Sequence, residues 1–206
     1  MKMRLASIVL LVLSLMVAAP AFAATLYSNG PINGTVNAWD VESPLAVSNS
    51  FTISSTSTMT GFDAGFWLNS GDTAVSVDWL IGTSAFGSTL GSGTASLSNA
   101  LFCSSCGIGS AYDIYTSTAS GLSIGLGAGT YWLTLQNGVT AGTSGMYWDE
   151  NDGPSLAQSS VVGAIGSEAF NIYGTTHTTI PEPGTLVMFA SGILGLGGML
   201  RRKLSL

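Results

Sequence analysis

Apolar and polar residues alternate along much of the central part of the chain. Four segments place apolar side chains at every second position, which is the period of a β-strand with one buried face. No window of ten residues between the two ends of the chain shows a convincing helical stripe. The four sets are Phe62, Ala64, Phe66 and Leu68; Val75, Val77, Trp79 and Ile81; Leu122, Ile124 and Leu126; and Tyr131, Leu133 and Leu135.

Turn-forming residues separate these segments, and the central part of the chain is rich in Ser, Thr and Gly. About eight or nine short strands at this spacing predict an all-β fold, a single β-sandwich or jelly-roll-like domain. The expected turns lie at 69–72, 125–129, 136–138 and 151–154, and further strands are expected at 36–41, 45–53, 90–97, 145–148 and 168–173.

The N-terminus has the three parts of a secretory signal peptide. Lys2 and Arg4 precede an apolar run at 5–17, and 21–23 offers small residues at the two recognition positions of a cleavage site. We therefore expect a signal-peptide helix within 1–23. The mature chain then begins at Ala24, in an oxidising compartment.

The C-terminus carries a second targeting segment. Prolines at 181 and 183 prevent any folded element from running through this point. An apolar stretch at about 185–200 follows, just long enough to span a bilayer. The basic residues after it stay on the cytoplasmic side, so the body lies outside. This predicts a β-sandwich domain at 24–173, a linker at 174–180 and a sorting or anchor segment at 181–206.

The order of these parts resembles the PEP-CTERM protein-sorting tail. That resemblance implies a Gram-negative, exopolysaccharide-producing bacterium, a membrane-embedded exosortase as processing partner, and cleavage near the PEP triplet. An ordinary single-pass anchor is the alternative. The residues that carry the resemblance are Pro181, Glu182, Pro183 and Gly184, followed after the apolar stretch by Arg201, Arg202 and Lys203.

The body also looks like a group of extracellular β-sandwich domains often found in front of this tail. The segments that carry this likeness are 61–67, 128–135, 147–151 and 168–170. The likeness implies a fold and no activity.

Charge excludes one class of partner. All five Lys and Arg lie in the two ends, so the body from 24 to 180 holds ten acidic residues, no Lys or Arg and the single His177. Nucleic-acid binding depends on basic side chains that neutralise phosphates, and anionic lipid surfaces need them too. We therefore expect no nucleic-acid partner.

Catalytic patterns are weak in this chain. We expect a local disulfide between Cys103 and Cys106, in a loop of this exported protein. A zinc site would need further ligands, and a redox role would need a helix after the cysteine pair. The sequence at 121–125 matches the nucleophile elbow, but Ser123 lies in a strand pattern and His177 in the linker. Facing carboxylates of a glycosidase cannot be placed from the sequence. We expect no enzyme.

Two binding hypotheses remain. Asp149, Glu150, Asn151 and Asp152 bring oxygen ligands into a short segment, read either as a solvated acidic turn or as a calcium site. Trp132 and Trp148 are candidates for stacking on sugar rings, although core packing is the default for each tryptophan.

These observations predict an exported, non-catalytic cell-envelope or extracellular-matrix protein. It is an inner-membrane intermediate with its body on the periplasmic side, and then reaches the cell surface or matrix. There it has a structural or adhesive role in exopolysaccharide and biofilm. The alternative is a carbohydrate-binding module with calcium at the acidic segment.

Overall fold

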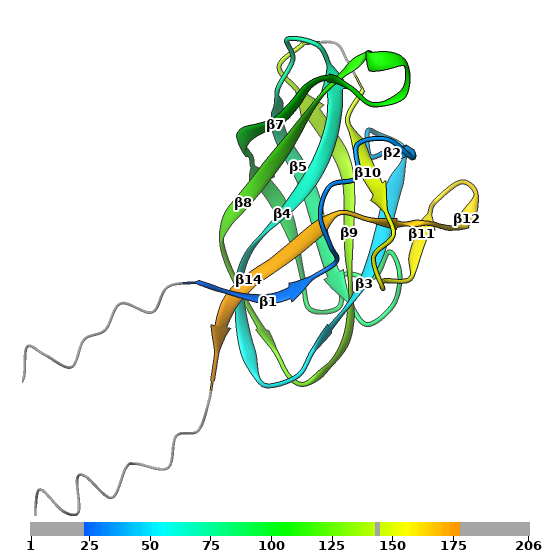
Figure 1. Ribbon diagram of the computed structural model, residues 1–206. Helices are drawn as coiled ribbons and strands as arrows, with labels where there is room; N and C mark the ends of the chain where they lie inside the picture. Colours follow the sequence, from blue (N-terminus) through cyan, green and yellow to red (C-terminus); the bar gives the residue numbers. More distant parts are fainter. Residues whose placement is uncertain (1–22, 143–144, 178–206) are drawn as a thin grey trace, which may run out of the picture. The chain divides into compact units, whose positions relative to one another are not determined.

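The computed structural model describes residues 23–142 and 145–177. Within them the chain forms two antiparallel sheets packed face to face, which confirms the predicted all-β sandwich (Figure 1). The predicted signal peptide, apolar stretch at 185–200 and sorting motif lie outside the described residues. No helix in the described part of the chain is long and apolar enough to cross a membrane.

The larger sheet is organised around its longest central strand, β4 (Ser57–Asn69), which pairs with three others. One side of β4 pairs along its whole length with β8 (Tyr112–Leu126). The other side pairs first with β14 (Phe170–Thr176) and then with β10 (Tyr147–Asn151). The outer strands are β1 (Ala24–Ser28) beside β14, β2 (Ala38–Asp40) and β13 (Ser167–Glu168) beside β10, and β7 (Ser98–Cys106) beside β8.

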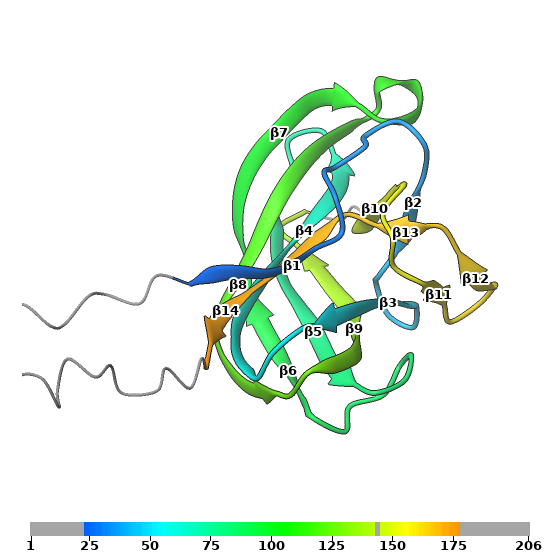
Figure 2. The same cartoon turned by 60° about the horizontal axis from the view of Figure 1, so that its bottom comes forward.

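The second sheet has six strands and lies across the core from the first (Figure 2). Two of its strands, β3 (Ala46–Ile53) and β9 (Gly129–Thr140), pair without a break from Ala46 opposite Gln136 to Ile53 opposite Gly129. A short 3-10 turn, η1 (Ile108–Ser110), connects β7 and β8. In spatial order the strands are β12 (Gly163–Ile165), β11 (Ala157–Ser159), β3 (Ala46–Ile53), β9 (Gly129–Thr140), β5 (Ala74–Gly82) and β6 (Gly91–Ser96).

The core lies between the two sheets, where the sequence alternation placed it. The alternating set on β4 is buried, with Phe62 and Phe66 fully inside. From β9, Leu133 and Leu135 face them across the interior. The large aromatic Trp148 of β10 fills the space beside Phe170, with ring centroids 5.7 Å apart.

Two expectations fail because of irregular pairing between β5 and β9. The stretch at 136–138, expected as a turn, lies inside β9; Asn137 has a φ of 50° there, and the pairing skips from Gln136 to Val139. The matching irregularity on β5 turns Val75 outward, with 45% of its surface exposed, although the alternation placed it on the buried face. A β-bulge changes side-chain phase in this way.

The end of the folded unit is also later than expected. β14 continues to Thr176, which pairs with Ser57, so the first three residues of the predicted linker belong to the sheet. A separate unit, His177–Leu206, follows. At the other end, β1 begins at Ala24, and Ala24 pairs with Gly174 near the end of β14. The first and last strands of the body therefore lie side by side.

Candidate functional site

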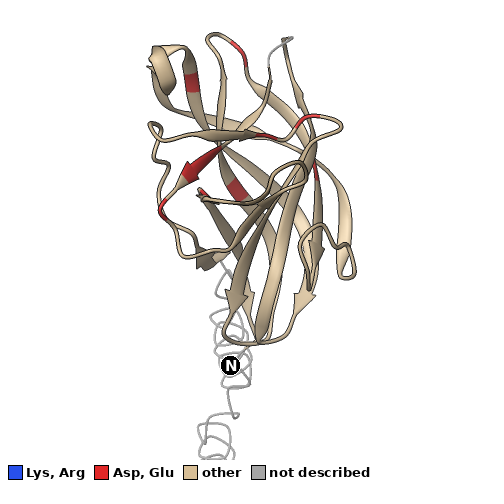
Figure 3. Cartoon of the chain, turned by 90° about the vertical axis from the view of Figure 1, so that its right-hand side faces the viewer, with Lys and Arg blue, Asp and Glu red and all other residues tan. Residues whose placement is uncertain are grey.

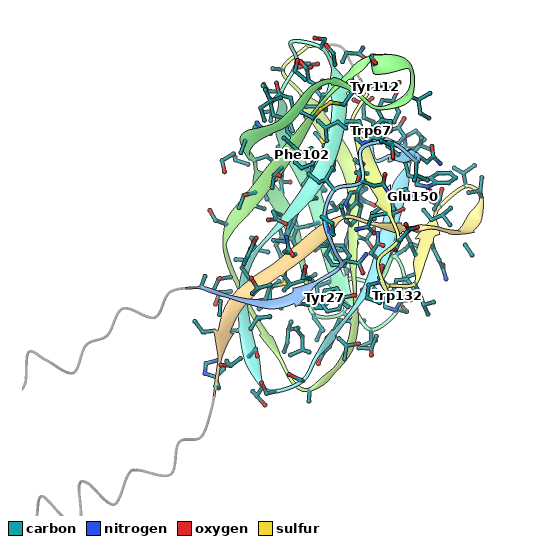
Figure 4. All side chains as sticks on the ribbon, viewed as in Figure 1. Tyr27, Trp67, Phe102, Tyr112, Trp132 and Glu150 are labelled. Carbon is teal, nitrogen blue, oxygen red and sulfur yellow. A yellow bond between two sulfur atoms is a disulfide. The ribbon has the colours of Figure 1, made fainter. Side chains whose placement is uncertain are left out.

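A groove lined by aromatic rings lies near the end of β4. Because Phe66 and Leu68 point into the core, Trp67 between them points to the outer face of the larger sheet. Figure 4 shows Trp67 and Tyr112 close together here. The hollow has a volume of about 270 Å³, and we call it the aromatic groove: Asn37, Ala38, Trp67, Ile108, Ala111, Tyr112 and Tyr147.

Three rings form a continuous surface in the aromatic groove. The Trp67 and Tyr112 centroids are 5.6 Å apart with a 46° angle between the planes. Tyr112 meets Tyr147 edge to face, at 5.9 Å and 71°. Trp67 is buried at the base, whereas both tyrosines are half-buried and open to solvent. Aromatic pairs in such tilted arrangements hold one another in place.

Trp67 is fixed from two sides. Its indole N–H donates a 2.6 Å hydrogen bond to Asp149, which is fully buried. Gly107 packs against its ring with a φ of 69°, and a Cβ at that position would come within 2.7 Å of the indole. Gly107 also donates its N–H to the Gly34 carbonyl, at 3.1 Å. The floor of the groove is therefore rigid.

Asp149 is a structural anchor inside the larger sheet. Its carboxylate accepts hydrogen bonds from the backbone N–H groups of Asn33 and Gly34, at 2.7 and 2.8 Å, as well as from Trp67. Burial raises the pKa of this carboxyl, and the three donors offset part of the rise. The solvated acidic turn, one of the two readings of this segment, therefore does not describe Asp149, which lies buried in strand β10; Asp152 alone of the four residues is exposed beyond the strand.

The four residues of the calcium hypothesis do not converge. Glu150 points to the opposite face of β10 from Asp149 and accepts the Trp39 indole N–H at 2.7 Å. Asn151 donates to backbone carbonyls, whereas Asp152 lies exposed in the loop beyond. Within 23–142 and 145–177 there is no group of three or more His, Cys, Asp or Glu placed to hold a metal ion.

A second buried acid, Glu168, lies opposite Glu150 in the β10–β13 pair. Glu168 is fully buried, and neither carboxyl oxygen accepts a hydrogen bond from the described residues. Burial is the largest cause that raises its pKa to about 9; the nearby Asn49 amide opposes part of that rise, and the charges of Glu150 and Asp149 add to it. Glu168 is therefore a neutral carboxylic acid at pH 7.

Hydrogen bonds tie the backbone around Glu168 to both sheets. Its N–H donates to the Asn49 side-chain oxygen on β3 at 3.1 Å, and its carbonyl accepts from the Asn29 amide at 2.6 Å. Ser155 donates to the same Asn49 oxygen at 3.0 Å. This polar cluster fixes one end of the sandwich around the buried Glu168 carboxyl.

Cys103 and Cys106 form a disulfide close to the aromatic groove. Both cysteines lie in the second half of strand β7, whereas a loop had been expected at this position. Between them, the Ser105 N–H and the Ser104 hydroxyl donate to Asp113, at 2.9 and 2.8 Å. These donors, with others from the 70–71 turn, lower the pKa of Asp113 to about 2. The disulfide segment is thus pinned beside the start of β8.

Another hollow, of about 290 Å³, lies further along β4 at Asp63 and Gly65. The Asp63 carboxylate accepts hydrogen bonds from the Asn171 backbone and amide and from the Tyr173 hydroxyl. Burial, followed by that carboxylate, raises the pKa of Tyr173 to about 12. The Asp63 and Asn171 side chains that line this hollow are therefore already hydrogen-bonded within the sheet. For that reason this hollow is a weaker candidate for a binding site than the aromatic groove.

The two tryptophans proposed for sugar stacking have different environments. Trp148 is completely buried in the core, so it offers no surface to a ligand. Trp132 is half-buried on the six-stranded sheet, away from the aromatic groove. The residues missed were Tyr112 and Tyr147. Strand alternation could have identified Tyr147, because an inward Trp148 requires its neighbour to face out.

The described part of the chain is thus an acidic β-sandwich domain with an aromatic groove on one sheet. Residues 179–203 match the family model of the PEP-CTERM protein-sorting motif, so this is a protein with a PEP-CTERM tail. The motif implies export, a membrane-anchored intermediate and processing by an exosortase. A search of curated proteins found no match to the chain.

Proposed function

We propose that this protein is a non-catalytic, adhesive component of the exopolysaccharide matrix and biofilm outside the cell. After exosortase processing, the β-sandwich body is the part that acts at the cell surface or in the matrix. The observation that carries the proposal is the aromatic groove, an open surface of tyrosine rings on a rigid strand framework. Half-buried tyrosines combine an apolar face with a polar tip, as polysaccharide contacts require.

The placement of the acidic residues favours adhesion over glycoside hydrolysis. A glycosidase needs two carboxyl groups facing one another across a cleft, roughly 5 to 10 Å apart. Asp149 and Glu150 point to opposite faces of β10, and the Asp149 oxygens accept three hydrogen bonds. Glu168 is enclosed in the sandwich, away from solvent. Binding a polysaccharide without cleaving it needs no such carboxylate pair and can use the aromatic surface of the groove alone.

The sorting step is tested by intact mass. The protein is recovered from the envelope or medium of its host and from the same host lacking exosortase. We expect a C-terminus near residues 181–184 in the first strain and the full tail, to Leu206, in the second. A full-length tail in both strains would show that the segment is a plain anchor.

The adhesive role is tested in the matrix itself. Extracellular polysaccharide from the host is washed, and the amount of retained protein is compared for the natural chain and a Tyr112→Ala, Tyr147→Ala double variant. We expect the natural chain to stay with the polysaccharide and the variant to wash out. Equal retention of both would leave a structural role that does not use the groove, and no retention of either would refute adhesion.

A further inference from the structure

We infer that the aromatic groove binds uncharged polysaccharide chains and discriminates against polymers that carry carboxylate, sulfate or phosphate groups. The inference rests on the proposed function and adds the chemical class of the ligand. It follows from the composition of the groove lining, the engagement of the acids around it, and the absence of Lys and Arg from the body.

The lining of the groove suits the apolar face of a sugar ring. Tyr112 and Tyr147 present half-buried rings at 71° to one another, and Ile108 at the rim has 60% of its surface exposed. A volume of about 270 Å³ is slightly below the usual range of small-molecule sites, roughly 300 to 1,000 Å³. The groove thus holds a short segment of a chain, and the rest of the polymer passes out over the rim.

Hydrogen-bonding groups of the lining are uncharged. The polar side-chain groups among the lining residues are the two phenols, the Asn37 amide and the Trp67 indole N–H, and the indole N–H is already donated to Asp149. Burial raises the pKa of Tyr147, and nearby Asp40, Tyr112 and Glu42 raise it further, so the phenol stays protonated. Neutral donors and acceptors of this kind match sugar hydroxyls, which also donate and accept.

The charges near the groove are all negative. Asp40 and Glu42 lie close enough to raise the Tyr147 pKa, and Glu150 accepts the Asn37 amide at 3.4 Å. Figure 3 shows acidic segments and no basic residue on the described body. An anionic polymer therefore meets like charges within a Debye length, about 8 Å at physiological salt, with no cation to offset them.

A cationic peptide is less well matched to this groove than a neutral glycan. The lining contains no carboxylate of its own. Glu150 is already engaged by the Trp39 indole, and Asp40 accepts the backbone N–H of Glu42 at 2.7 Å. The surrounding acids would attract an ammonium group at long range, but the lining itself presents ring surface and no carboxylate to pair with it directly.

The experiment measures binding of the exported protein, isolated from its host, to soluble polymers of matched length. The uncharged probes are dextran, a linear β-glucan and a galactomannan; the acidic probes are alginate and hyaluronan. We expect each acidic probe to bind at least about tenfold more weakly than the best neutral probe. We also expect that gap to narrow as salt rises from about 10 to 500 mM, because salt screens the repulsion.

Variants assign the binding to the groove. Tyr112→Ala and Tyr147→Ala should each weaken neutral-polymer binding at least about tenfold. Trp132→Ala, which removes a half-buried aromatic ring from the other sheet, should leave it unchanged. If an alanine variant fails to fold, Ile108→Asp replaces an exposed rim residue with a charge and should also weaken binding.

Several results would overturn the inference: no binding to any neutral polymer, acidic polymers bound as tightly as neutral ones, loss of binding from Trp132→Ala alone, or oligolysine bound through Tyr112 and Tyr147 in place of glycans. Failure of the matrix-retention test refutes the adhesive role. If the natural protein stays with the matrix polysaccharide but binds acidic polymers more tightly than neutral ones, only the selection against charged polymers is refuted.

Discussion

Replacing Glu168 with glutamine should make the body more stable at neutral and alkaline pH. The folded protein holds this carboxyl as a neutral acid with a pKa near 9, whereas in the unfolded chain its pKa is about 4.5. Between pH 4.5 and pH 9 the folded protein binds a proton at Glu168 that the unfolded chain has lost. The unfolding free energy is therefore unaffected by this group below pH 4.5 and falls as pH rises above it. Glutamine has a similar shape and no proton to hold.

The expected size follows from the gap between the two pKa values. Each pH unit above the unfolded pKa costs about 1.4 kcal/mol, so at pH 7 the natural protein has lost about 3 kcal/mol relative to pH 4.5. The Glu168→Gln variant should recover most of that amount at pH 7 and almost none at pH 4. Some pH dependence should remain, because burial also raises the pKa of Asp149.

Urea unfolding at pH 4, 5.5, 7 and 8.5 measures this difference, followed by tryptophan fluorescence. The control is Asp152→Asn, which removes a carboxylate from the exposed loop after β10 and should leave the slope of stability against pH unchanged. Parallel curves for Glu168→Gln and the natural protein would show that Glu168 is ionised or hydrated in the fold, and the burial reasoning would be wrong.

Three further predictions concern the support of the aromatic groove. Trp67→Phe removes the indole donor to buried Asp149 and should lower the unfolding free energy by about 1–3 kcal/mol, measured by urea titration; an unchanged midpoint would contradict the anchoring role. Cys103→Ser opens a closed loop of only a few residues and should cost about 2 kcal/mol, checked against the natural protein with and without reductant. The donors around Asp113 lower its pKa to about 2, so stability present above pH 3.8 is lost as pH falls through about 2; acid titrations should show a smaller loss for Asp113→Asn, and identical curves would argue against these bonds.

Sequence patterns predicted the sandwich because alternation survives wherever strands pair regularly. The sets on β4, β8 and β9 were correct for this reason. Val75 and the stretch at 136–138 were wrong because a bulge changes which face a side chain occupies, and no local residue pattern fixes its position. The strands β1, β7, β11 and β12 were missed because they carry no clear apolar alternation: β7 exposes most of its side chains, and β11 and β12 have only three residues each.

The candidate site was harder to predict than the fold. Three acids in four residues suggested a solvated turn, but Asp149 is buried because the backbone of 33–34, more than a hundred residues away, covers it. Trp148 was one candidate for sugar stacking, with core packing as the default, and its place beside Phe170 puts it in the core. The groove joins residues from β2, β4, η1, β8 and β10, so only the three-dimensional pairing reveals it.

The pairing of β14 with β4 has a mechanical consequence for a protein held at one end. Thr176, the last residue of β14, pairs with Ser57 at one end of β4, and Trp67 in the groove lies ten positions further on, roughly 33 Å along the strand. A load applied between a bound polymer and the tail therefore runs parallel to these strands. It stretches the β4–β14 hydrogen bonds together in shear and does not open them one by one, so single-molecule pulling from the C-terminal end against the groove should give a higher rupture force than pulling across the sheet.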